Sequence, residues 1–83
     1  MERQVEVYTN PECPNCSAVK EQLLSHGIPF IEKDITSARS VRQEMVDRTG
    51  SMSVPTMIIG EKIIIGYDQP LIEAALHRER EVD

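Results

Sequence analysis

Apolar and polar residues alternate in the first part of the chain. Val5, Val7 and Thr9 are separated by more polar neighbours, and this period of two predicts a strand over residues 4–9. The turn-forming run Asn10-Pro11-Glu12 follows it. We therefore expect a short strand that ends in a turn just before residue 13.

From Cys13 onward the apolar residues recur at helical spacing. The residues expected on the buried face of this helix are Cys16, Val19, Leu23 and Leu24. Gly27 is expected to cap the helix, and Pro29 just beyond it cannot continue a helix.

The middle of the chain is predicted to hold a second strand and a second helix. The strand spans residues 30–35. Thr36 and Ser37 are expected to cap a helix that runs to about Thr49. Gly50 ends it. The residues expected on its buried face are Ala38, Val41 and Met45.

Two short β-rich runs and a last helix complete the pattern. Residues 57–59 and 63–65 predict a hairpin. Asp68 and Pro70 are expected to start the last helix. Its inward residues are expected to be Leu71, Ile72, Ala75 and Leu76. The order β-α-β-α-β-β-α needs a parallel pair at its start and an antiparallel pair at its end, so the fold class is α/β with a four-stranded mixed sheet and helices on its faces.

Length and charge narrow the possible functions. The chain has 83 residues, which predicts a single domain over residues 1–83. Its net charge of −5 and its lack of a basic run argue against a nucleic-acid partner. It has no apolar stretch long enough for a signal peptide or a membrane span. We expect a cytoplasmic protein with no membrane partner.

The motif that can carry chemistry is Cys13-Pro14-Asn15-Cys16, placed where a strand gives way to a helix. A disulfide that closes so short a loop would restrict the unfolded chain very little and add little stability. This favours a redox-active cysteine pair over a structural disulfide. Free backbone N–H groups and a partial positive charge in the first turn of a helix stabilise a thiolate. Cys13 is therefore expected to be the exposed nucleophile and Cys16 the sheltered resolving thiol.

Other interpretations of these residues are less favoured. A structural zinc site needs four ligands, the motif supplies two, and the two histidines lack the usual paired spacing, so we expect no metal site. Ser53-Val54-Pro55-Thr56 on its own indicates the start of a strand. Gly66-Tyr67-Asp68 on its own indicates a turn with a helix cap.

Taken together, the motifs resemble those of glutaredoxins, over most of the chain from Val5 to about Leu76. The matching segments are Tyr8-Thr9, Cys13-Pro14-Asn15-Cys16, Val54-Pro55 and Gly66-Tyr67-Asp68. The sequence looks most like the small bacterial glutaredoxin-like proteins of the YruB type, which are close to the NrdH redoxins. The resemblance implies a thioredoxin fold with sheet order 2-1-3-4. It also implies a cis peptide bond before Pro55 that lies against the cysteines.

The resemblance implies a dithiol oxidoreductase that reduces protein disulfides or glutathione mixed disulfides. No cofactor is expected to be bound, either glutathione as co-substrate or thioredoxin reductase is expected as the reductant, and the protein is expected to act as a monomer. The residues expected to bind substrate or glutathione are Tyr8, Asn10, Pro14, Val54, Pro55, Gly66, Tyr67 and Asp68.

Departures from the family pattern leave the reductant open. Asn10 stands where glutaredoxins usually carry a lysine for a glutathione carboxylate, whereas Asp68 matches the acidic residue that meets the glutathione amino group. Pro70 resembles the NrdH redoxins, so the alternative is an NrdH-like electron donor reduced by thioredoxin reductase. A further alternative is a dimer that shares an iron–sulfur cluster, although Pro14 is unfavourable for that role.

Overall fold

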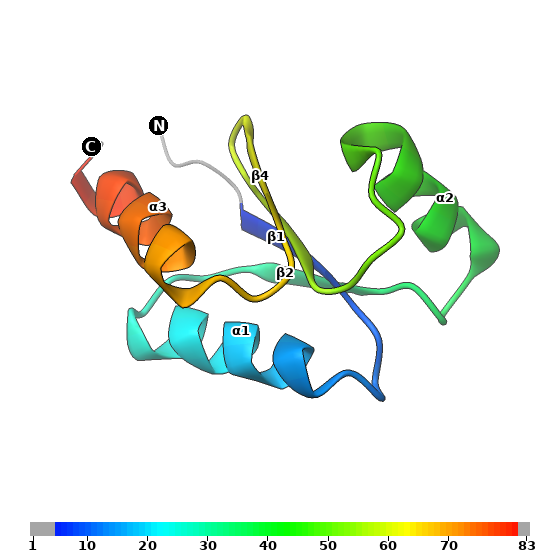
Figure 1. Ribbon diagram of the computed structural model, residues 1–83, viewed down its shortest axis with the longest axis horizontal. Helices are drawn as coiled ribbons and strands as arrows, with labels where there is room; N and C mark the ends of the chain where they lie inside the picture. Colours follow the sequence, from blue (N-terminus) through cyan, green and yellow to red (C-terminus); the bar gives the residue numbers. More distant parts are fainter. Residues whose placement is uncertain (1–4, 82–83) are drawn as a thin grey trace.

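In the computed structural model a four-stranded sheet lies between helices on its two faces (Figure 1). The structure describes residues 5–81, with side chains described as far as Leu76. The strands are β1 (Val5–Thr9), β2 (Ile31–Asp34), β3 (Thr56–Ile59) and β4 (Lys62–Ile65), and the helices are α1 (Pro14–Ser25), α2 (Arg39–Thr49) and α3 (Gln69–Glu81). Within residues 5–81 no helix is both long enough and apolar enough to cross a membrane.

The strand order is β2-β1-β3-β4, as the resemblance implied. Central β1 pairs in parallel with β2, with Val7 opposite Glu32, and antiparallel with β3, with Val7 opposite Met57. β3 and β4 form the predicted antiparallel hairpin. The chain therefore has the α/β thioredoxin fold.

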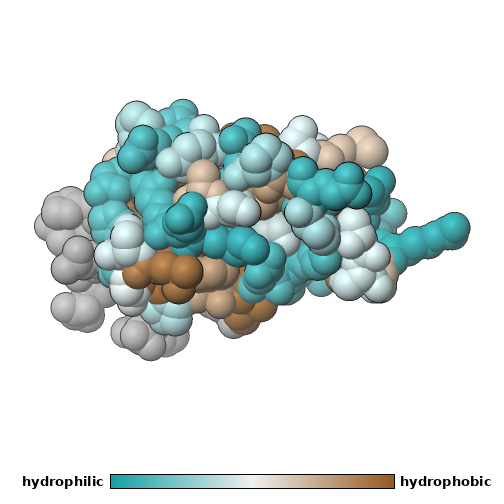
Figure 2. Space-filling view, turned by 90° about the horizontal axis from the view of Figure 1, so that it is seen from below, coloured by the Kyte–Doolittle hydropathy of each residue, from teal (hydrophilic) through white to brown (hydrophobic). Residues whose placement is uncertain are grey.

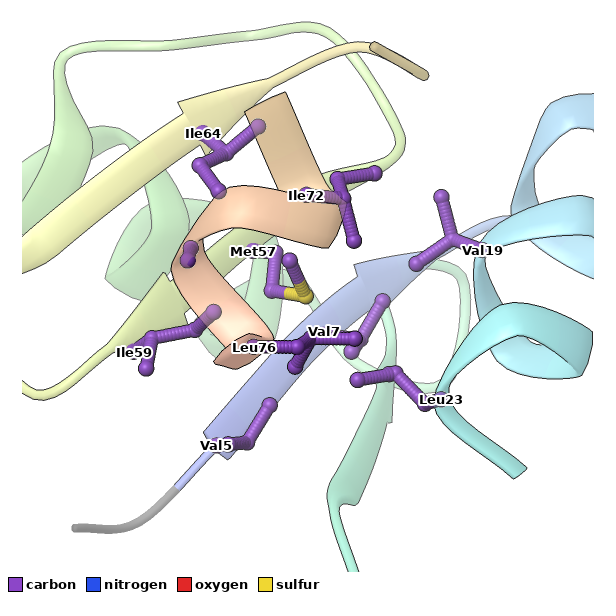
Figure 3. Close-up of a cluster of buried hydrophobic side chains, with 10 residues drawn as sticks. Val5, Val7, Val19, Leu23, Met57, Ile59, Ile64, Ile72 and Leu76 are labelled. Atoms are coloured by element: carbon purple, nitrogen blue, oxygen red, sulfur yellow. The ribbon is translucent and has the colours of Figure 1, made fainter. Parts of the chain in front are cut away.

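The larger apolar core lies between the sheet and the pair α1 and α3. Figure 3 shows side chains from the strands and from both helices pointing toward one another. The buried members of this cluster are Val5, Val7, Val19, Leu23, Met57, Ile59, Ile64, Ile72, Ala75 and Leu76. Full burial of one such aliphatic side chain stabilises the fold by roughly 1.5–3 kcal/mol, so this cluster fixes α1 and α3 against the sheet.

The opposite face of the sheet is covered by α2. Its apolar cluster is smaller: Tyr8, Ile35, Met45 and Ile58. Side chains of a strand point alternately to the two faces. For this reason Val7 of β1 belongs to the larger core, while its neighbour Tyr8 faces α2.

A network of charged side chains ties α2 to β1 and β2 beside this second cluster. Arg48 donates through Nη1 and Nη2 to the two carboxylate oxygens of Glu6, each at 2.8 Å. Lys33 of β2 contacts the same carboxylate at 2.9 Å and also pairs with Glu44. Only 11% of the Glu6 side chain is exposed, so these partners compensate for its burial.

The second helix starts later than predicted. Thr36 and Ser37 do not cap it, because their backbone N–H groups and hydroxyls bond instead to Asp34 at the end of β2. The helix begins at Arg39, and its N-cap residue Ala38 offers no side-chain hydrogen bond. Ala38 is also exposed rather than buried. The predicted boundary was wrong because Asp34 competed for these groups.

Two leucines expected in the core are exposed. Leu24 is 68% exposed and Leu71 is 39% exposed. On α1 the neighbouring inward position belongs to Gln22, whose amide donates to the backbone oxygen of Gln69 and to Glu73 of α3. Seen from the side on which α1 lies, the surface is mostly hydrophilic with small hydrophobic areas (Figure 2). The buried stripe of α1 is thus narrower than the sequence suggested.

Replacing Glu6 by Gln should make stability less sensitive to acid. Arg48 and then Lys33 hold the pKa of the Glu6 carboxyl at about 2, below its ordinary value of 4.5. A carboxyl whose pKa is lowered on folding stabilises the protein above its unfolded pKa, and this contribution is lost as the pH falls from 4.5 toward 2. Between neutral pH and about pH 2, the free energy of unfolding should fall by about 2–3 kcal/mol more in wild type than in Glu6→Gln, as measured by urea denaturation.

Glu21→Gln is the matched control for this comparison. Glu21 is an exposed carboxylate of α1, so its removal should leave the acid dependence of the wild type in place. Equal losses of stability in wild type and Glu6→Gln would contradict the role given to the network.

Candidate active site

Three segments that are far apart in the sequence meet at one edge of the sheet. β1 ends at this edge and leads toward the cysteines. Because β3 runs antiparallel to β1, its first residue, Thr56, lies here opposite Tyr8. Thr56 also faces Ile65, the last residue of β4. The sheet thus brings Cys13, the Val54-Pro55 loop and the turn after β4 to the same side of the molecule.

The turn between β1 and α1 is built around Asn10. The backbone oxygen of Asn10 accepts a hydrogen bond from the N–H of Cys13 at 3.0 Å. Its side-chain Oδ1 accepts another from the N–H of Glu12, also at 3.0 Å. Asn10 therefore shapes the predicted turn and presents Cys13, a role typical of asparagine.

Cys13 occupies the N-cap position of α1. The backbone N–H of Cys16 points at the sulfur of Cys13, with N and Sγ 3.3 Å apart. Pro14 fills the first helical position, where no backbone N–H is needed. Cys13 is half-buried and Pro14 is exposed, so this sulfur can be reached from solvent.

Cys16 lies one turn further into the helix and in the protein interior. It is 2% exposed and shares the inward face of α1 with Val19 and Leu23. Burial raises the pKa of its thiol to about 11, and the hydrogen bond with Cys13 acts in the same direction. Both cysteines carry free thiols in this structure. The pair therefore combines one accessible sulfur with one sheltered sulfur, as predicted from the motif.

The loop that opens β3 lies against Cys13. The thiol of Cys13 donates to the carbonyl oxygen of Val54, with Sγ and oxygen 3.8 Å apart. The Val54-Pro55 peptide bond is cis, which confirms the expectation. The N–H of Gly66 donates to the carbonyl of Pro55 at 2.7 Å and so joins the turn after β4 to this loop.

Hydroxyl groups hold this loop in shape. The Ser51 hydroxyl lies 3.2 Å from that of Thr56 and accepts a hydrogen bond from the N–H of Ser53 at 3.0 Å. Thr56 also donates to the carbonyl of Ser53. Ser51 and Thr56 are buried, so these bonds replace water for their hydroxyls. This support was not predicted, although the cluster of serine and threonine residues around Pro55 indicates it in the sequence.

Asp68 and Tyr67 are exposed at the same edge of the sheet. One carboxylate oxygen of Asp68 accepts a hydrogen bond from the N–H of Leu71 at 3.1 Å, which makes Asp68 the predicted N-cap of α3. Tyr67 as a residue is 36% exposed. Both side chains are therefore accessible to a ligand that reaches Cys13 from this side.

Tyr8 is the one predicted binding residue that the structure does not bring to the site. Its side chain is fully buried against α2. Its hydroxyl donates to Glu44 and accepts from Arg48 at 2.9 Å. Burial raises the pKa of the phenol. The expected contact between Tyr8 and a bound ligand is therefore not available, because residue 8 faces the opposite side of β1 from α1.

A cavity of about 480 Å³ lies at the start of α2, away from the predicted site residues. Its lining residues are Ile35, Thr36, Ala38, Arg39, Arg42 and Gln43. Neither cysteine lines it. Among the described residues, no group of three or more His, Cys, Asp or Glu side chains is placed to hold a metal ion.

Comparison with known proteins identifies the family. The family model described as Glutaredoxin matches residues 5–64. Glutaredoxin 3 of Escherichia coli K12 is 39% identical over 64 residues, which cover 77% of each chain. A glutaredoxin-like 8.6 kDa protein from the rubredoxin operon of Clostridium pasteurianum is 28% identical over 89% of this chain and 99% of its own.

A solved structure agrees with these sequence matches. The crystal structure of the thioredoxin-like protein BC3987 superposes with a TM-score of 0.83 at 29% identity, over 87% of this chain and 99% of the other. The family match spans both cysteines, the Val54-Pro55 loop and most of the sheet. The chain therefore belongs to the glutaredoxin family, and it is a thiol-disulfide oxidoreductase.

Proposed function

We propose that the protein reduces disulfides by a two-thiol mechanism in which Cys13 attacks the substrate and Cys16 resolves the intermediate. The observation that carries this assignment is the unequal setting of the two sulfurs. Cys13 is accessible at the start of α1, whereas Cys16 is 2% exposed. A substrate disulfide can reach only the first of them directly.

The reaction proceeds in two exchanges that conserve thiols and disulfides. The thiolate of Cys13 attacks one sulfur of the substrate, a Cys13–substrate disulfide forms, and the other substrate sulfur leaves and takes up a proton from solvent. Cys16 then loses its proton to solvent and attacks the sulfur of Cys13. The Cys13–substrate disulfide breaks, the Cys13–Cys16 disulfide forms, and the second substrate sulfur leaves as a thiolate and takes up a proton from solvent. Two electrons have passed from the protein to the substrate.

The Val54 loop is suited to hold the substrate during the first exchange. The carbonyl of Val54 lies beside the sulfur of Cys13, and the cysteine of a bound substrate must come to the same place. An extended segment can bond to exposed backbone in the manner of an added strand. We propose that Val54 aligns the substrate in this way, with Pro14 and Tyr67 at the rim of the site.

Glutathione mixed disulfides and protein disulfides are the proposed substrates, with glutathione as the reductant. Asp68 supplies an exposed carboxylate for the amino group of glutathione. Asn10 supplies no positive charge for a carboxylate, and its Oδ1 is already engaged with Glu12. A neutral donor binds a carboxylate less strongly than an ammonium group does, so we propose that glutathione is used with reduced affinity.

Alkylation should distinguish the two thiols. Iodoacetamide added to the reduced protein at mildly acidic pH should label Cys13 more than about tenfold faster than Cys16, because the thiolate is the reacting species and burial disfavours it at Cys16. Peptide mapping by mass spectrometry measures the two rates. Faster labelling of Cys16 would reverse the assignment.

Serine substitutions should separate the two exchanges. Cys16→Ser should accumulate a mixed disulfide with the substrate, visible by intact mass, since no resolving thiol remains. Cys13→Ser should lose disulfide reductase activity, while circular dichroism confirms that both variants are folded. Substantial activity in Cys13→Ser would show that the proposed mechanism is wrong.

Charge changes at positions 10 and 68 should alter the apparent affinity for glutathione in a coupled assay with glutathione reductase. Asn10→Lys should improve it about fivefold by adding an exposed ion pair, worth about 1 kcal/mol. Asp68→Asn should weaken it by a similar factor, and asparagine can still cap α3.

Asn10→Asp is the matched control at position 10, because it keeps an acceptor for the N–H of Glu12 and adds the opposite charge. It should weaken the use of glutathione. If none of these three variants changes the apparent affinity, the proposed glutathione groove is not used, and reduction by thioredoxin reductase becomes the better proposal.

A further inference from the structure

The second exchange requires Cys16 to become a thiolate inside the protein. This sulfur must carry negative charge when it attacks Cys13, yet it lies on the inward face of α1 beside Val19 and Leu23. An apolar environment disfavours a thiolate. For the proposed two-thiol mechanism to proceed at neutral pH, another group must therefore stabilise the buried thiolate of Cys16.

Lys20 is placed to provide this compensation. It follows Cys16 by four residues on α1, so the two side chains lie one above the other on the same side of the helix. Residues with this spacing have Cβ atoms roughly 5–6 Å apart. The side chain of Lys20 is 31% exposed, so its charge is only partly screened by water.

Contacts with the sheet fix the direction of the Lys20 side chain. Its Nζ lies 3.0 Å from Oε2 of Glu32 on β2. The same carboxylate oxygen accepts a hydrogen bond from the hydroxyl of Thr9 at 2.9 Å. Thr9 is 2% exposed and is the last residue of β1. Lys20 is thus held at the edge of the sheet that carries the two cysteines.

We infer that Lys20 is a positioning residue for the resolving step: its ammonium group, held by Glu32, stabilises the thiolate of Cys16 while that sulfur attacks Cys13. The inference rests on the proposed two-thiol function. The direction of the charge effect agrees with it: burial and then Cys13 raise the pKa of Cys16 to about 11, whereas a backbone hydrogen bond with Asn10 and, after it, the charge of Lys20 lower this pKa.

Other charged groups around this position do not replace Lys20. Among the residues whose side chains the structure describes, the other ionisable groups on the segments that meet at this edge are acidic or phenolic: Glu12, Asp34, Tyr67 and Asp68. The loop from Val54 to Thr56 contributes no ionisable side chain. Among these neighbours, Lys20 is the one that brings positive charge toward Cys16.

The test measures the two exchanges separately with a neutral probe, 2,2′-dipyridyl disulfide. Attack by Cys13 releases one equivalent of pyridine-2-thione in a phase that depends on probe concentration. Attack by Cys16 on the mixed disulfide releases the second equivalent in a phase that does not. Stopped-flow absorbance follows both phases, and the pH dependence of the second phase reports the ionisation of Cys16.

Removing the charge should change the second phase specifically. In Lys20→Met the pH midpoint of this phase should rise by about 0.5–1 unit, and below the midpoint the phase should slow about three- to tenfold, while the first phase changes less than about twofold. Lys20→Arg should keep the wild-type midpoint because it keeps the charge.

Two controls separate the charge of Lys20 from other effects. Glu32→Gln removes the ion pair and a negative charge but leaves a hydrogen-bond acceptor for Lys20. The pH midpoint of the second phase should therefore not rise in this variant. Lys62→Met removes one positive charge, as Lys20→Met does, but at the exposed start of β4, the end of this strand away from the cysteines. It should leave both phases unchanged.

The outcomes distinguish a failure of the two-thiol mechanism from a failure of the role given to Lys20. Release of a single equivalent by the wild-type protein would overturn the two-thiol mechanism itself. Two phases with an unchanged midpoint in Lys20→Met would overturn the role of Lys20 alone. An equal rise of the pH midpoint of the second phase in Lys20→Met and Glu32→Gln would also overturn the role of Lys20. The ion pair would then act only by holding α1 against β2.

Discussion

The structure depends above all on the two-sided pairing of β1, which is parallel to β2 and antiparallel to β3. A shift of one residue in either register would turn Val7 toward α2 and bring Glu6 into the larger apolar core. Burying an unpaired carboxylate there would be very costly. The contacts of Glu6 with Arg48 and Lys33 therefore protect the register, and with it the edge at which the cysteines and the Val54 loop meet.

Features set by neighbouring residues in the chain were predictable from the sequence. The alternation of β1 between the two faces of the sheet and the start of α1 at the cysteines are local, and both agree with the structure. The expected stop is also local: Gly27 has a positive φ just after the helix, although the C-cap residue itself is His26. The sheet order and the cis bond before Pro55 came from resemblance to a family. The position of Cys13 against Val54 could then be expected, since both lie beside the ends of paired strands.

Features set by contacts between distant segments were not predictable. Periodicity placed Leu24 in the core, but the structure gives the inward position to Gln22 because α3 offers it hydrogen-bond partners. A motif placed Tyr8 in the binding site, but the direction of its ring follows from the alternation of β1 and from the presence of α2. The pair formed by Lys20 and Glu32 joins a helix to a strand, and no local pattern indicates it.

Cys16 is the first buried residue of α1, and this position restricts which residues can replace it during evolution. Serine is a preferred N-cap residue, so sulfur can be exchanged for oxygen at Cys13 without loss of the cap. At Cys16 the same exchange places a hydroxyl among apolar side chains, and a larger residue forces repacking around Val19 and Leu23. Replacement of the second thiol therefore has to meet the packing of the core, whereas replacement of the first has to meet only the needs of the N-cap.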